Sequence, residues 1–289
     1  MNKKPYIYLE SQGGFGHRTT MWEVVYQINK LNDFRFDILV DIERFVEVEY
    51  LDYPHTIGVI DSKRYWNNTK WIKLDNYMNL DTLHPYGEVI NWKLDADKED
   101  MCEDFENKFY TSYNRPYQLI DMKDKKLKDK IIRKMKNCVG VHIRRGDVVI
   151  AHKDKNHPDH GVQEYLPDEY FINLCDKIVE KNPKQKFYLS TDGSWDQVKF
   201  FYDRYDVIDA YYVLNNKREP ELLREKFIET GLQQHHVFNL YSVIDLFALI
   251  YTKILISSRS AWSDFCRLYN NHKNVINPWD NKNNFLGVI

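Results

Sequence analysis

Apolar and polar positions along the first part of the chain switch between strand-like and helix-like spacing. Tyr6–Leu9 is a short β-type run, and the glycine-rich segment Gly13–Gly16 follows it. Across Thr19–Leu31 the apolar residues recur every three or four positions, which predicts a helix. Phe36–Asp41 predicts a second strand and His55–Ile60 a third. Strand, glycine loop and helix in this order are typical of the start of a Rossmann-like layer.

From Cys138 onward the pattern becomes a regular series of apolar strands and amphipathic helices. The predicted strands are Val139–Ile143, Lys186–Ser190, Ala210–Leu214, Ile254–Ser257 and Val275–Asn277. The predicted helices are Pro167–Glu180, Trp195–Tyr205, Tyr241–Thr252 and Ala261–Tyr269. Strands that alternate with helices predict a parallel sheet covered on both faces, so the fold class is α/β.

The lysine-rich segment Asp121–Asn137 separates these two parts of the chain. Its apolar residues recur at helical spacing (Leu127, Ile131, Ile132 and Met135), which favours a solvated amphipathic helix over a nucleic-acid patch. A chain of 289 residues suits two domains of roughly 100–150 residues each. We expect an N-terminal Rossmann-like domain at residues 1–125 and a C-terminal one at 126–289, whose last residues return to the first domain.

Composition restricts the classes of partner. The formal net charge is −2, so the chain has no global field that would attract nucleic acid, and any anion site must be local. No segment approaches about 18 consecutive apolar residues, and the N-terminal apolar run is too short for a signal peptide. The four cysteines are scattered and fit a reducing compartment. We expect a soluble, cytoplasmic protein without a membrane span.

The strongest chemical signal is the segment His142-Ile143-Arg144-Arg145-Gly146-Asp147, directly after a buried strand. Ligands of open α/β sheets bind at the carboxyl ends of the strands. Guanidinium groups match phosphate oxygens in pairs and stay charged at any working pH, so Arg144 and Arg145 predict an anion site. The alternative is a structural Arg–Asp network that includes Asp147.

Two further strand ends carry ligand chemistry. Asp192, after Lys186–Ser190, can accept hydrogen bonds from a ribose or a base, or it can cap the helix that follows. The turn that contains Ser258, Arg259 and Ser260 can form an anion cradle at a helix N-terminus, or Ser can cap that helix without a ligand. Three such strand ends in one half of the chain together predict a nucleotide-diphosphate ligand there.

The glycine loop of the first half is a weaker signal, because its spacing is not GxGxxG. Glycines allow the backbone to approach a ligand closely. We expect Gly14, Phe15, Gly16 and His17 to contact the donor from the first domain, with Glu23 farther along the helix.

These motifs resemble those of the fucosyltransferase superfamily that shares an HxRRxD motif, most nearly its α1,2 branch. In that branch a polar loop with a His-Gly pair and a Tyr-rich helix start follow the motif, as Asp154–Gly161 and Leu166–Phe171 do here. Lys186–Gly193 is similar to the family's second motif and Asp245–Tyr269 to its third. The loop Gly13–Gly16 is similar to the family's N-terminal GxxGN loop.

The resemblance implies a GT-B fold, in which two Rossmann-like domains face each other across a cleft. The C-terminal domain would hold GDP-fucose and the first domain the glycan acceptor. Fucose would be transferred to an acceptor hydroxyl with inversion, without a metal ion and without a cofactor besides the GDP-sugar co-substrate. The DxD-like Asp95-Ala96-Asp97 is better interpreted as surface carboxylates.

The resemblance also implies roles for the residues. Arg144 would bind the β-phosphate and stabilise the charge that grows as GDP leaves. Arg145 and Asp147 would fix the loop, while His142, Asp192, Ser258 and Ser260 would hold the nucleoside and phosphates. His160, Asp147 and Glu23 are candidates for a general base by location. Two alternatives stay open: another GDP-deoxyhexose donor such as GDP-rhamnose, and a non-catalytic protein that binds nucleotide sugars or glycans.

Overall fold

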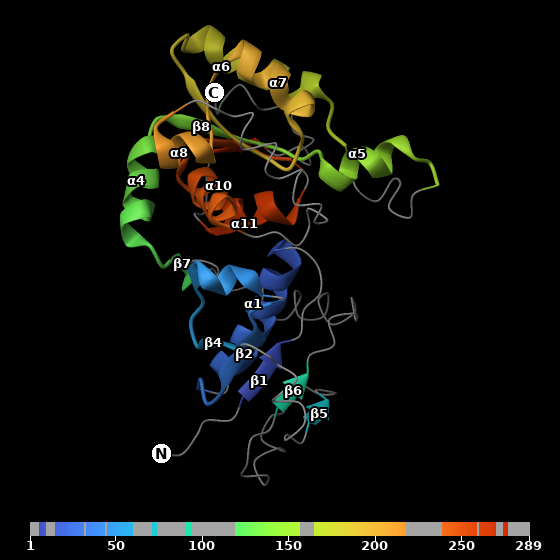
Figure 1. Ribbon diagram of the computed structural model, residues 1–289, viewed down its shortest axis with the longest axis vertical. Coiled ribbons are helices and arrows are strands. Elements are labelled where there is room, and N and C mark those ends of the chain that lie inside the picture. The colour runs from blue at the N-terminus through green and yellow to red at the C-terminus, as the bar shows by residue number, and fades with distance from the viewer. Residues whose placement is uncertain are drawn as a thin grey trace. The chain divides into compact units, whose positions relative to one another are not determined.

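The chain consists of two compact units, Met1–Lys123 and Asp124–Ile289. The computed structural model in Figure 1 describes residues 6–9, 15–31, 33–43, 45–59, 71–73, 91–93, 119–156, 165–217, 239–258, 260–269 and 274–276. Within these residues, no helix has the length and apolar character that a membrane crossing requires.

The first unit is built on a five-stranded sheet with the order β4-β2-β1-β6-β5, in which all paired strands are parallel. The strands are β1 (Tyr6–Leu9), β2 (Asp37–Asp41), β4 (Thr56–Val59), β5 (Trp71–Lys73) and β6 (Asn91–Lys93). A short antiparallel pair joins β3 (Leu51–Asp52) to β7 (Asp121–Met122). The strands predicted at Tyr6–Leu9, Phe36–Asp41 and His55–Ile60 are confirmed.

Helix α1 (Phe15–Leu31) follows β1 and buries Trp22, Val25, Tyr26 and Asn29 at helical spacing. The Asn29 amide donates to the Phe36 carbonyl and accepts from the Phe36 N–H, which ties the end of the helix to the start of β2. The helix begins four residues earlier than predicted. Phe15 and Gly16 therefore belong to its first turn and not to a loop, because Phe15 is itself buried.

The second unit contains a parallel sheet with the order β10-β9-β8-β11-β12. Its strands are β8 (Cys138–Ile143), β9 (Lys186–Thr191), β10 (Asp206–Ile208), β11 (Ile254–Ile256) and β12 (Val275–Ile276). The chain starts in the centre with β8, moves outward on one side to β9 and β10, and then returns to build β11 and β12 on the other. This is the strand order of a doubly wound Rossmann-like sheet.

Helices cover both faces of this sheet, as Figure 1 shows. Successive side chains of β8 point to opposite faces, so Val139, Val141 and Ile143 share one core with α6 (Asp168–Lys181) and α7 (Trp195–Arg204). The opposite face packs against α10 (Leu240–Tyr251), beside α4 (Lys125–Met135), α8 (Ala210–Asn215) and α11 (Ala261–Tyr269). The predicted two-sided covering of a parallel sheet is confirmed.

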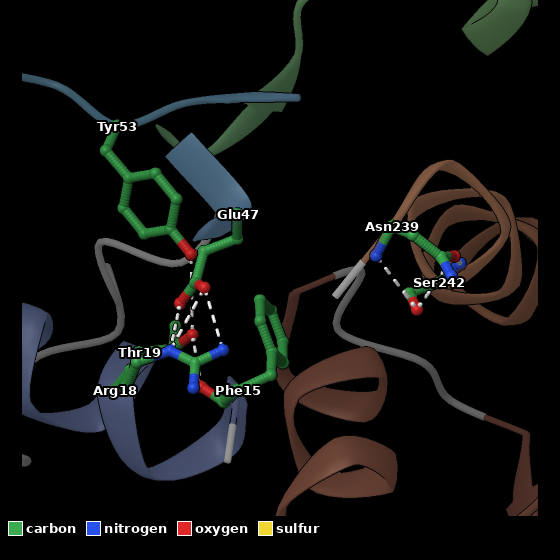
Figure 2. Close-up of polar contacts among 7 residues, drawn as sticks. All are labelled: Phe15, Arg18, Thr19, Glu47, Tyr53, Asn239 and Ser242. Carbon is green, nitrogen blue, oxygen red and sulfur yellow. Dashed lines mark hydrogen bonds and ion pairs between the residues drawn. The ribbon is translucent and has the colours of Figure 1, made fainter. Parts of the chain in front are cut away.

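Helix α10 is the central helix of that second face, and it buries a continuous run of apolar side chains. Its N-terminus is capped by Asn239, whose side chain accepts from the N–H groups of Tyr241 and Ser242. Figure 2 shows Asn239 beside Ser242. Gly140 of β8 allows Thr252, at the end of α10, to pack closely against the strand, since a Cβ at position 140 would lie 2.6 Å from Thr252 Oγ1.

The prediction of a strand at Ala210–Leu214 is wrong. The strand of this region is β10 (Asp206–Ile208), and the following residues form α8. Asp209 caps that helix by accepting from the Tyr212 N–H, and the buried residues Ala210 and Val213 are three positions apart, as a helix requires. The lysine-rich helix is confirmed as α4, but it starts at Lys125 because Asp121–Met122 pairs with β3.

Candidate functional site

Polar residues gather at the carboxyl edge of the second unit's sheet. Strand β8 lies between β9 and β11, and the chain leaves β8 and β11 toward opposite faces. The gap between these two strands is therefore the topological switch point, where open α/β sheets bind their ligands. His142 lies near the end of β8, and the serine turn Ser257–Ser260 follows β11.

His142 lies at the centre of a hydroxyl cluster at this switch point. Its Nδ1 atom is 2.6 Å from Ser263 Oγ, 2.7 Å from Ser258 Oγ and 3.4 Å from Ser260 Oγ. The Ser260 hydroxyl donates to Ser263 Oγ, so the Ser263 hydroxyl proton is available to Nδ1. This network favours the tautomer with its proton on Nε2, which makes Nε2–H the donor for a ligand.

Burial lowers the pKa of His142 to about 3, and the neighbouring Arg144 charge adds to this effect. The imidazole is therefore neutral at physiological pH. A neutral ring can donate one hydrogen bond without placing a second full charge beside Arg144.

This buried neutral histidine predicts an acid-sensitive second unit. The ordinary pKa of histidine is 6.5, and the folded protein lowers the pKa of His142 to about 3. Between these two pH values the unfolded chain therefore binds a proton on His142 and the folded chain does not. The free energy of unfolding should therefore fall as pH falls below 6.5, by about 1.4 kcal/mol per pH unit from this group. Urea unfolding at a series of pH values, followed by circular dichroism, would measure it.

The matched comparison uses two histidine variants. His142→Asn should remove this part of the pH dependence, while His152→Gln, at an exposed position on α5 (Gly146–Lys153), should keep it. An unchanged acid slope in His142→Asn would show that this ring is not held neutral by burial.

Arg145 is a buried support of the loop after β8, with 2% of its surface exposed. Its guanidinium donates to the carbonyls of Arg144 and Leu166, at 3.0 Å each, and forms an ion pair with Asp168. The same group lies 4.9 Å from the centre of the Tyr165 ring. These contacts favour the loop-fixing role over the donor-binding role that the sequence also allowed.

Asp192 supports the same loop from the end of β9. Its carboxylate accepts from the Arg145 backbone N–H at 2.5 Å. The alternative role of helix cap belongs instead to Ser194, which forms a capping box with Gln197 at the start of α7. Between them, Gly193 leaves room for Arg145, because a Cβ at Gly193 would lie 2.9 Å from the Arg145 Cβ. Asp192 and Gly193, both after β9, thus help to fix the position of Arg145.

Arg144 immediately precedes Arg145 in this loop and is half-buried, whereas Arg145 is buried. Gly146 begins α5, so both arginines lie just before a helix N-terminus, whose partial positive charge also favours anions. Asp147 occupies the first turn of α5. Arg144, together with neutral His142 and the serine turn, gives this edge the chemistry of an anion site.

In the first unit, an ion pair is buried just after the glycine loop. Arg18 of α1 donates to both carboxylate oxygens of Glu47, at 2.9 and 3.0 Å from Nε, and its Nη2 lies 2.8 Å from Glu47 Oε2. Glu47 belongs to η1 (Val46–Glu49). Figure 2 shows this pair beside Thr19 and Tyr53, whose hydroxyls are 3.5 Å apart. This cluster fixes the first turn of α1 against η1.

The remaining predicted site residues lie in several places. His17 and Gly16 are in the first turn of α1, and Glu23 is buried on the same helix. Gly14, His160 and Arg259 lie outside the described residues. Three supporting residues were not among the predicted set, namely Tyr165, Asp168 and Ser263. Two of them had a signal in the sequence: Ser263 is a further hydroxyl residue shortly after the serine turn, and Asp168 lies in the helix start Leu166–Phe171.

Among the residues that the structure describes, no group of three or more His, Cys, Asp or Glu side chains could hold a metal ion. The described cysteines, Cys138, Cys175 and Cys266, are buried free thiols.

No protein-family profile matches the chain, and no curated protein sequence matches it. Among solved structures, the chain is similar to POFUT1 in complex with GDP, with 10% identity over 95% of this chain and 97% of that one and a TM-score of 0.50. It is also similar to the fucosyltransferase NodZ from Bradyrhizobium, with 14% identity over 92% and 93% of the two chains and a TM-score of 0.47. The α/β prediction is confirmed, and the fold is of the GT-B type.

Proposed function

We propose that this chain is a glycosyltransferase that transfers fucose from GDP-fucose to a hydroxyl of a glycan acceptor. The observation that carries the proposal is the switch point of the second unit, where Arg144, neutral His142 and the serine turn meet at one sheet edge. The shared fold with POFUT1, solved in complex with GDP, supports GDP as the nucleotide. The polar loop Asp154–Gly161 with its His-Gly pair and the helix start Leu166–Phe171 support the α1,2 branch.

Arg144 binds the β-phosphate in this proposal. As the bond between the anomeric carbon and the β-phosphate oxygen breaks, negative charge grows on that oxygen, and a fixed guanidinium stabilises it without reorganisation. This electrostatic role is the one that a metal ion plays in other transferases, so the reaction proceeds without one. Arg145 and Asp192 act through Arg144, because they hold the loop that carries it.

The acceptor hydroxyl attacks the anomeric carbon from the face opposite the diphosphate. The new carbon–oxygen bond forms as the old one breaks, so the configuration inverts and GDP leaves with the bonding electron pair. The hydroxyl proton passes to a base, for which Asp147, His160 and Glu23 are the candidates by sequence. His142 donates from Nε2 to the nucleotide and is not a base, since burial holds its pKa far below physiological pH.

A nucleotide-sugar panel tests the donor. Thermal shifts of the full chain should be largest with GDP and GDP-fucose and small with UDP or ADP sugars, because binding to the folded state stabilises it by mass action. GDP-fucose with a glycan array should then yield a fucosylated product whose linkage gives the acceptor and the stereochemistry.

Three results would redirect the proposal. A shift with GDP-rhamnose but not GDP-fucose would change the donor and keep the site. Tight binding of GDP-fucose with neither transfer nor hydrolysis would indicate a non-catalytic binding protein. The absence of any shift with a GDP sugar would contradict the proposal as a whole.

A further inference from the structure

A second feature of the chain lies away from the sheet edge that carries the candidate site. Residues 125–136 contain seven Lys or Arg side chains and one acidic side chain, Asp129, a net charge of +6. The whole chain has a formal net charge of −2, so all other residues together carry −8. The positive charge is therefore concentrated on one short segment of an otherwise acidic protein.

Four of these seven side chains, Lys125, Lys126, Arg133 and Lys136, are exposed, and the other three are half-buried. Helix α4 packs against α10 and α8, and its side chains Ile131 and Met135 are completely buried in the second unit. Lys126, Arg133 and Lys136 are exposed on its outer side. We call the exposed cationic side chains of residues 125–136 the basic α4 surface. Because Ile131 and Met135 are buried in the unit, the exposed side of this helix is mainly charged.

The first turn of the helix and two of its side-chain pairs carry charges that oppose the stability of the helix. Three of the first four residues, Lys125, Lys126 and Lys128, are cationic at the end of the helix dipole that favours negative charge, where Asp124 supplies the cap. Lys126 and Lys130, like Lys130 and Lys134, are like-charge pairs four residues apart. Repeated destabilising charges in one helix indicate that these charges have a role other than folding.

Neighbouring elements add to the same field. The Lys134 ammonium lies 4.4 Å from the centre of the Tyr212 ring and donates to Asn216, next to exposed Lys217. Burial, followed by the charge of Lys186 on β9, lowers the pKa of Lys134. The Lys186 ammonium is itself 3.9 Å from the Asp206 carboxylate. Positive charge thus continues from α4 onto the adjoining strand and helix ends.

We propose that the basic α4 surface docks the second unit on the anionic surface of a lipid bilayer. Clusters of four to eight Lys or Arg side chains on an amphipathic helix suit anionic headgroups, which need only charges spread over a plane. Nucleic acid suits this surface less well, since α4 (KKLKDKIIRKM) has no aromatic side chain for stacking on bases and the rest of the chain is acidic. The contact is peripheral, because the apolar residues Ile131 and Met135 are buried in the core of the unit and do not insert.

Vesicle sedimentation of the full chain tests the proposal. The protein should bind phosphatidylcholine vesicles that contain phosphatidylglycerol and not vesicles of phosphatidylcholine alone. Raising the salt from about 0.1 M to about 1 M shortens the Debye length from about 10 Å to about 3 Å and should release it. The triple variant Lys126→Gln/Arg133→Gln/Lys136→Gln should weaken the partition coefficient by about 100-fold, at roughly fivefold per charge.

A second triple variant is the matched control. Lys177→Gln/Lys184→Gln/Lys199→Gln also removes three exposed positive charges, from α6, α7 and the turn between α6 and β9, on the opposite face of the sheet. It should bind vesicles like the wild type. No binding to the anionic vesicles, or equal losses in both triple variants, would overturn the proposal. Binding to duplex DNA without binding to vesicles would overturn it too and assign the surface to nucleic acid.

Discussion

Replacement of Arg144 by Ala should reduce the turnover of GDP-fucose by about 10²–10³-fold, the usual cost of losing one fixed donor to a developing oxyanion. Arg144 is half-buried, directly after β8 and beside neutral His142. The substitution removes its charge from the sheet edge while the supports of the loop stay in place. Steady-state kinetics of GDP release, together with GDP affinity by calorimetry, would measure the effect.

The loss should appear mainly in kcat, because the charge on the β-phosphate oxygen is greatest in the transition state. Arg144→Lys should recover only part of the rate. A lysine ammonium supplies the charge, but it cannot form the two parallel hydrogen bonds of a guanidinium with phosphate.

The adjacent arginine gives the matched control. Arg145→Ala removes the donors to Leu166 and Arg144 carbonyls and the partner of Asp168, so it should lower the free energy of unfolding by about 2–4 kcal/mol. Arg144→Ala should lower that free energy by less than Arg145→Ala does, because Arg144 is half-buried and Arg145 is almost completely buried. If Arg144→Ala turned over GDP-fucose at nearly the wild-type rate, the β-phosphate role would belong to another residue.

The order of elements in the second unit could be predicted from the sequence because each element has a local signal. Apolar runs between turn residues mark β8, β9 and β11, and amphipathic spacing marks α6, α7 and α11. The run Ala210–Leu214 was misassigned because apolar and aromatic residues in five positions fit either a strand or a helix. The Asp209 cap settles that choice, and capping depends on geometry that a short apolar pattern does not reveal.

Only those residues of the candidate site that lie within local sequence motifs could be predicted. Strand ends and their polar residues pointed to His142, Arg144 and Asp192. The partners were not predictable, because the Asp168 carboxylate and the Leu166 carbonyl approach Arg145 from more than twenty residues away. Which of the two adjacent arginines supports the loop and which is left to bind an anion is therefore decided by the fold. The local pattern Arg-Arg is the same whichever of them is buried.

In the first unit, Arg18→Met should lower the local stability of α1 by about 3–5 kcal/mol, the usual cost of removing one partner from a buried ion pair. The side chain of Arg18 is 3% exposed and that of Glu47 is fully buried, so the substitution leaves a carboxylate without its counter-charge. Hydrogen exchange of the α1 amides in the full chain would measure the effect. At about 1.4 kcal/mol per tenfold change, we expect exchange to become at least 100-fold faster.

The pH dependence of this loss identifies its cause. Burial already raises the pKa of Glu47, and the hydrogen bond and charge of Arg18 oppose that increase. Without Arg18 the pKa of Glu47 should rise further. A carboxyl whose folded pKa lies above its unfolded value stabilises the fold at low pH and loses that contribution as pH rises through the folded pKa. The deficit of Arg18→Met should therefore be larger at pH 7 than near the ordinary pKa of 4.5.

The double variant Arg18→Met/Glu47→Leu separates the cost of an unpaired charge from the value of the pair. Buried ion pairs contribute little net stability compared with apolar side chains of similar volume, so the double variant should recover most of the protection that Arg18→Met loses. Arg35→Met, at an exposed position of the same unit, should leave α1 exchange unchanged. If Arg18→Met and the double variant were equally destabilised, the guanidinium would stabilise α1 by its packing beside Phe45, 6.0 Å from the ring centre, and not by its charge.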